Sequence, residues 1–140
     1  MAFVFSLALI GLGLLARALV SDWQIPQEWI NNALAASDVA PDPFNFEGVI
    51  TLSAVSFGFL SGLAWWIKKF GFPKIETKGA LLIVRYLLGM VGLAILYIGL
   101  KVILPEDPEI LGLVLRFLRY ALVGFWVTAG APMIFRKLKI

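Results

Sequence analysis

The sequence lacks both cysteine and histidine. Without cysteine the chain has neither disulfides nor thiolate metal sites, and cysteine usage gives no hint of the redox compartment. Without histidine it also lacks the commonest general base and metal ligand. Charged residues are scarce at 15%, compared with about 25% in soluble domains. These shortages exclude the most familiar catalytic and metal sites and point away from a soluble domain.

Apolar residues are abundant instead, at 61% of the chain, and the mean hydropathy is +0.92. They form four long runs, over residues 2–20, 48–67, 79–104 and 110–135. Each run reaches, or nearly reaches, the roughly 20 residues that cross a 30 Å bilayer core as a helix. We therefore predict an all-α integral membrane protein in which residues 1–140 form one membrane domain with four transmembrane helices.

The connections between these runs alternate in charge. Acidic residues, without lysine or arginine, occur in residues 21–47 and 105–109. The charged side chains of residues 68–78 are four lysines and one glutamate, and those of residues 136–140 are all basic. Lysine and arginine in short connections stay on the cytoplasmic side. The pattern predicts a multi-pass protein of the cell membrane with the N- and C-termini in the cytoplasm.

The first external connection, residues 21–47, is long enough to form structure of its own. Pro26 suits the first turn of a helix, and the apolar residues that follow share one face. That face consists of Trp29, Ile30, Ala33 and Leu34. We expect a short amphipathic helix on the outer membrane surface, and a lid over a lipid-binding crevice remains the alternative.

Arg116 and Arg119 are three residues apart in the fourth run, so they are expected to share a helix face. An arginine inside the membrane costs at least about 2.5 kcal/mol, so it usually faces protein or reaches back to the surface. One interpretation is a site for a lipid phosphate, because guanidinium groups bind phosphate oxygens in a forked geometry. The other is ion pairing with nearby carboxylates, namely Glu47, Glu106, Asp107 and Glu109. Arg85 lies near the cytoplasmic end of the third run and can reach that surface.

Gly58 and Gly62 in the second run are four residues apart, a spacing that lets two helix backbones approach closely. The pattern indicates helix packing and does not identify a partner. The runs contain no deeply placed carboxylate and no obvious helix break, which argues against a transporter or channel. Since no nucleophile, base and oxyanion donor come together, we predict no catalytic residue, no cofactor and no metal site.

From Gly13 to the C-terminus the chain resembles the C-terminal membrane half of some bacterial members of the type 2 phosphatidic-acid phosphatase family. The blocks that carry the resemblance are 14–20 (LLARALV), 22–26 (DWQIP), 47–49 (EGV), 62–65 (GLAW), 85–89 (RYLLG), 118–127 (LRYALVGFWV) and 131–135 (APMIF). The resemblance implies a helical membrane protein that belongs with a phosphatase acting on lipid phosphates or isoprenyl diphosphates.

Catalysis in that family depends on Lys-x6-Arg-Pro, Pro-Ser-Gly-His and Arg-x5-His-x3-Asp segments, and none of them occurs here. No catalytic residue can therefore be carried over, and the expectation leans away from an enzyme. The resemblance implies an accessory half, which leaves open a fragment, a separately encoded piece or a paralogue reused as a membrane subunit. We expect a non-catalytic transmembrane module that contacts membrane lipids and a larger membrane partner, not nucleic acid. The alternative is a segment that helps a phosphatase, catalytic elsewhere, to bind its lipid phosphate.

Overall fold

The computed structural model describes residues 1–37, 40–42, 44–72, 79–104 and 110–140. Within these residues every regular element is a helix. In chain order they are α1 (Ala2–Leu19), α2 (Gln27–Ala36), α3 (Glu47–Phe70), α4 (Ala80–Ile103), α5 (Ile110–Phe125), a π-helical turn η1 (Trp126–Gly130) and α6 (Ala131–Leu138).

Four helical stretches in the described part of the chain are long and apolar enough to cross a membrane. They are α1, α3, α4 and the continuous helix Ile110–Leu138 formed by α5, η1 and α6. The predicted fold class is therefore confirmed: this is an all-α integral membrane protein with four membrane-spanning helices.

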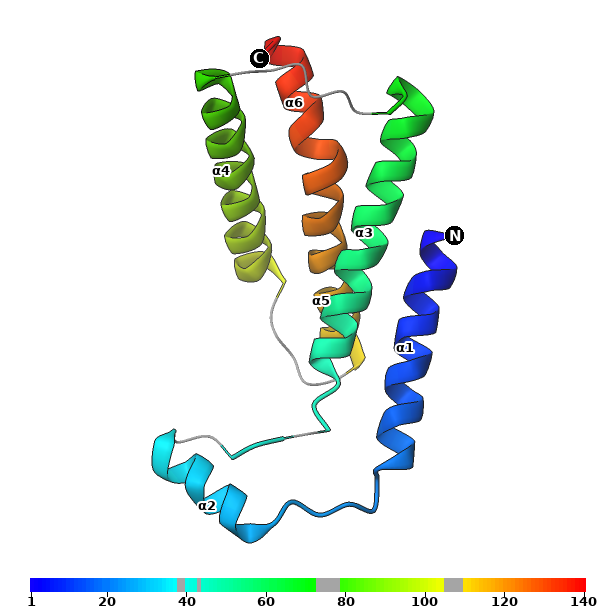
Figure 1. The fold of residues 1–140 in the computed structure, drawn as a ribbon, viewed down its shortest axis with the longest axis vertical. Coiled ribbons are helices and arrows are strands. Elements are labelled where there is room, and N and C mark those ends of the chain that lie inside the picture. Colours follow the sequence, from blue (N-terminus) through cyan, green and yellow to red (C-terminus); the bar gives the residue numbers. More distant parts are fainter. Residues whose placement is uncertain (38–39, 43, 73–78, 105–109) are drawn as a thin grey trace.

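The two ends of the bundle differ in the charged residues that they carry. The end of α3, the start of α4 and the C-terminus lie at one end, which we call the basic end (Figure 1). Its charged residues within the described chain are Lys68, Lys69, Arg85, Arg136, Lys137 and Lys139. The opposite end, which we call the acidic end, holds α2 and the start of α3. Its acidic residues are Asp22, Glu28, Asp42 and Glu47, and the basic residues Arg17, Lys101 and Arg116 also lie toward this end. The predicted connection 105–109, with Glu106, Asp107 and Glu109, and residues 73–78 lie outside the described residues.

Local sequence explains where α3 begins and ends. At its start, Asn45 Oδ1 accepts a hydrogen bond of 2.8 Å from the backbone N–H of Glu47. At its other end Gly71 adopts a φ of +80°, and its N–H bonds to the carbonyl of Ile67 at 2.9 Å. Glycine takes this left-handed conformation at little steric cost, so the helix stops there. α3 thus extends to Phe70, beyond the predicted end at residue 67.

The helix expected in the first connection is present as α2, with Pro26 immediately before its first residue. Proline fixes φ near the helical value and lacks an N–H that would be unsatisfied there. Trp29 on α2 lies beside Trp23, with ring centroids 6.1 Å apart. Figure 1 shows α2 lying across the direction of the other helices, beyond the acidic end.

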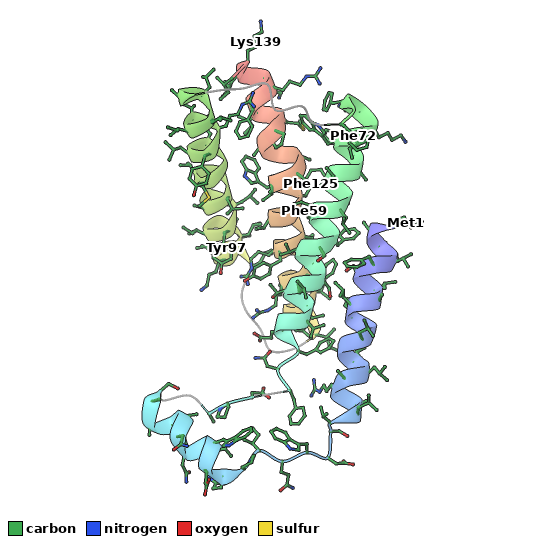
Figure 2. The ribbon with its side chains drawn as sticks, in the orientation of Figure 1. Met1, Phe59, Phe72, Tyr97, Phe125 and Lys139 are labelled. Carbon is green, nitrogen blue, oxygen red and sulfur yellow. The ribbon has the colours of Figure 1, made fainter. Side chains whose placement is uncertain are left out.

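The buried core is small and lies mainly between α3 and α5. Its apolar members are Ile50, Ala54, Ala121, Ala129 and Ala131. Large apolar side chains point outward, particularly on α1 and α4 (Figure 2). This pattern is typical of membrane helices, because lipid solvates large apolar side chains as well as a protein interior does. Small residues form the close contacts between the helices.

α1 and α4 flank this core and contribute little to it. The buried residue of α1 is Ser6, whose Oγ donates a hydrogen bond of 3.0 Å to the carbonyl of Ser53 on α3. α4 has no buried residue along its length. These two helices therefore present most of their surface to the membrane or to another protein.

The fourth span was expected to be an uninterrupted helix over 110–135, but it widens by one residue at η1 and continues to Leu138. Within η1 the N–H of Ala131 bonds to the carbonyl of Trp126, the spacing of a π-helix. Pro132 follows directly. A proline ring inside an α-helix clashes with the carbonyl four residues earlier, here Thr128. The wider turn moves that carbonyl away from the ring.

Candidate functional site

The seam between α3 and α5 is built from small residues that bring the two backbones into contact. A Cβ atom added at Gly58 would overlap the carbonyl of Ala121 on α5. From the other side, a Cβ at Gly124 would overlap the carbonyl of Val55 and lie 2.8 Å from the backbone nitrogen of Phe59. Neither glycine has room for a methyl group, so this seam fixes the relative position of α3 and α5.

The π-helical turn supplies two polar links between helices. Thr128 Oγ1 donates a hydrogen bond of 3.0 Å to the carbonyl of Phe59 on α3. Trp126 Nε1 donates one of 3.1 Å to the carbonyl of Gly89 on α4. The indole ring of Trp126 lies so close to Gly92 that a Cβ there would overlap it. The turn therefore connects the last span to both of its neighbours.

Arg116 lies at the acidic end of the bundle and bridges α5 to α3. Its Nη2 atom is 2.7 Å from Glu47 Oε2. The two side chains are 17% and 44% exposed, and they line a cavity of about 570 Å³ together with Asn45 and Thr51. Ion pairs as exposed as this one contribute little to stability, about 1 kcal/mol or less. The pair orients Arg116 more than it stabilises the fold.

Arg119 is the most deeply buried charged residue of the described chain, with 2% of its surface exposed. Its guanidinium carbon lies 5.0 Å from the ring centroid of Tyr120 and 5.9 Å from that of Tyr97 on α4. Cations are attracted to the faces of aromatic rings, more strongly where water is excluded. The two tyrosine rings, 6.1 Å apart, thus form an aromatic environment for this charge.

Arg116 and Arg119 were expected to share a face, and the structure directs them to different neighbours. Arg116 contacts Glu47 of α3, whereas Arg119 faces Tyr97 of α4. Their other predicted partners, Glu106, Asp107 and Glu109, lie outside the described residues. Arg85 at the basic end donates a hydrogen bond of 2.5 Å from Nη2 to the main-chain oxygen of Ile140.

Sequence reasoning missed Trp126 and Thr128, which connect three helices. The available signal was Pro132 inside an apolar run, shortly after Gly130. In the part of the chain that the structure describes, no three carboxylates, histidines or cysteines come together as a metal site would need. The described residues provide close helix packing, an ion pair and cation–aromatic contacts.

Comparison with known families fits this arrangement. A family model described as the transmembrane extension of PAP2 superfamily phosphatases matches residues 50–140. The chain belongs to this family. No curated protein and no solved structure gives a match.

The PAP2 transmembrane extension covers most of α3 and all of α4, η1 and the helices on either side of it. It therefore contains the glycine seam, the π-helical turn and the three arginines described above. α1 and α2 lie before the matched residues, although the resemblance noted from the sequence began at Gly13. The description of the family as a transmembrane extension of PAP2 superfamily phosphatases associates this membrane module with those enzymes.

Proposed function

We propose that this chain is a non-catalytic membrane module that packs against the catalytic core of a PAP2 phosphatase. The observation that carries the proposal is the match of residues 50–140 to a family defined as an extension of these enzymes. The absence of histidine from the sequence supports a role outside the chemistry. In this proposal the core belongs either to the same polypeptide or to a separate subunit.

The exposure of α1 and α4 supports a packing role. Leu12 on α1 and Ile98 on α4 are each 61% exposed, and α4 has no buried residue. Membrane helices associate with other helices through close packing and interhelical hydrogen bonds, and this association does not require a hydrophobic driving force. These two helices offer the phosphatase core the largest free helical surface of the described chain.

Photo-crosslinking in native membranes tests this proposal. We expect benzoylphenylalanine at position 12 or 98 to crosslink to peptides of a PAP2 catalytic core, identified by mass spectrometry through its histidine motifs. The same group at Trp29, which is 59% exposed on α2, is the control outside the spans and should give no such adduct. Lipid adducts alone at both membrane positions would refute the proposal.

The orientation in the membrane is a further proposal, with the basic end in the cytoplasm. Because the sequence has no cysteine, single-cysteine variants carry one thiol each. We expect a membrane-impermeant maleimide added to intact cells to label Glu28→Cys at the acidic end. Lys139→Cys at the basic end should react only after permeabilisation. Labelling of both variants in intact cells would contradict this orientation.

A second candidate function is binding of a lipid phosphate by Arg116 and Arg119 on behalf of the phosphatase. The observation that favours it is the burial of Arg119, because intramembrane charges usually mark functional sites. The pairing of Arg116 with Glu47 supports the packing role instead. The activity measurements described in the Discussion distinguish the two.

A further inference from the structure

A groove runs between α4 and the last span, on the half of the bundle nearer the basic end. It has a volume of about 270 Å³. Its walls are apolar, with Gly89 and Met90 from α4 and Trp126 and Val127 from η1. Gly89 leaves one wall without a side chain, and Trp126 is fixed by its hydrogen bond to the carbonyl of that glycine.

Arg85 is the charged residue of the groove. It is half-buried, its guanidinium carbon lies 5.9 Å from the centre of the Phe135 ring, and its Nη2 bonds to Ile140. Its Nε atom is buried and finds no hydrogen-bond acceptor among the described residues. A guanidinium has five N–H donors, so Arg85 retains capacity for an additional acceptor.

Among the described residues, the charged side chains at the same end as Arg85 are all basic, and the acceptor bonded to Arg85 is the main-chain oxygen of Ile140, the last residue of the sequence. The acidic residues of the described chain, from Asp22 to Glu47, all lie at the opposite end (Figure 1). Arg136, Lys137 and Lys139 lie at the same end as Arg85; Figure 2 marks Lys139 there. No acidic side chain of the described residues lies near Arg85, so an anion that bonds to its remaining N–H groups comes from outside these residues.

We propose that this groove binds one anionic phospholipid from the leaflet at the basic end. The phosphate accepts hydrogen bonds from Arg85, and an acyl chain lies along Gly89, Met90 and Trp126. Basic pockets between membrane helices bind anionic headgroups in this way, because the cation and the apolar wall match the two parts of the lipid. This site is separate from Arg116 and Arg119 and does not depend on the proposed phosphatase partner.

A second groove beside the same helices provides an internal comparison. It has a volume of about 340 Å³ and is lined by Leu88, Val91 and Ile134, again with Trp126, but by no charged side chain. Such a groove accepts an acyl chain of any lipid. The selectivity of the first groove for an anionic headgroup therefore depends on Arg85.

Fluorescence quenching of Trp126 measures this selectivity directly. The four other tryptophans, Trp23, Trp29, Trp65 and Trp66, are changed to phenylalanine in the full chain. The protein is placed in phosphatidylcholine vesicles with brominated phosphatidylglycerol or brominated phosphatidylcholine. We expect the brominated anionic lipid to be preferred about fivefold, the contribution of one cationic side chain near an anionic headgroup.

Two matched pairs of variants complete the experiment. Arg85→Gln should remove the preference for the anionic lipid. Arg136→Gln should preserve it, because Arg136 does not line the groove and its guanidinium carbon lies 4.1 Å from the ring centroid of Phe70 on α3. Gly89→Leu should fill the groove and also remove the preference, whereas Gly99→Leu should not, because a Cβ at Gly99 meets no neighbouring atom within 4 Å. Circular dichroism verifies that each variant is folded. If Arg85→Gln does not fold, the comparison of Gly89→Leu with Gly99→Leu tests the proposal instead.

Three results would overturn the inference. The first is equal quenching by both brominated lipids in the parent chain. The second is an equal loss of preference in Arg85→Gln and Arg136→Gln, which would indicate diffuse surface charge. The third is relief of the preference by millimolar inorganic phosphate, which would assign the site to a free anion.

Discussion

Replacing Gly58 by alanine is expected to lower the free energy of unfolding by about 1–3 kcal/mol, the usual cost of an overpacked core. The added methyl group would overlap the carbonyl of Ala121, which belongs to the backbone and has no rotamer by which to move. α3 and α5 would have to separate along the seam, which would also disturb the contact of Gly124 with Val55. Reversible unfolding in mixed detergent micelles, followed by circular dichroism, measures the change.

The matched control lies on the same helix. A Cβ at Gly48 of α3 meets no neighbouring atom within 4 Å, so Gly48→Ala should change stability by about 0.5 kcal/mol or less. Both variants add one methyl group and remove one helical glycine. The difference between their free energies of unfolding therefore measures the contribution of the seam between α3 and α5. Equal stability of the two variants would show that close approach of α3 and α5 is not what holds the bundle together.

The chain purified alone is expected to show no hydrolysis of phosphatidic acid or isoprenyl diphosphates. The family resemblance implies a histidine that accepts the phosphoryl group, and this sequence has none. Phosphate release from lipid in mixed micelles provides the measurement, with an empty-vector membrane preparation as the control. Turnover that follows the purified protein through a second, unrelated chromatography step would refute the non-catalytic role.

The same assay, applied to the chain assembled with its PAP2 catalytic core, separates the two candidate functions. If the chain only packs, Arg116→Leu and Arg119→Leu together should leave KM for the lipid phosphate unchanged. If the two arginines bind the substrate phosphate, KM should rise about tenfold or more, because hydrogen bonds to charged groups contribute about 1.5–3 kcal/mol. We expect an unchanged KM, since Arg116 already pairs with Glu47.

The transmembrane helices could be predicted because their signal is local. Apolar runs of sufficient length, charged connections and Pro26 each act within a few residues, and the helices begin and end near the predicted positions. Gly58 and Gly62 marked a packing face on the second span. Their spacing did not show that Ala121 and Thr128 of the last span lie opposite them, because helix pairing depends on residues far apart in the chain.

The two arginines show where such reasoning stops. A separation of three residues places Arg116 and Arg119 on neighbouring parts of one helix surface. Whether they meet one partner or two depends on where α3 and α4 lie around that helix. The structure places α3 beside Arg116 and α4 beside Arg119, and periodicity alone has no information about this arrangement.

The contacts made beyond the π-helical turn make the length of α5 as important as its composition. A π-helical turn holds one residue more than an α-helical turn, so removing one residue from Trp126–Gly130 would restore α-helical spacing and leave α6 at about the same rotation relative to α5. Removing one residue from α5 instead would rotate all later residues by about 100°, so Phe135 would turn away from Arg85 and Arg136 from Phe70. Such a deletion in α5, though it would leave the hydropathy of the span almost unchanged, would disconnect the later part of the span from its neighbours. Single-residue insertions and deletions should therefore be tolerated in the connections of this protein and selected against within α5.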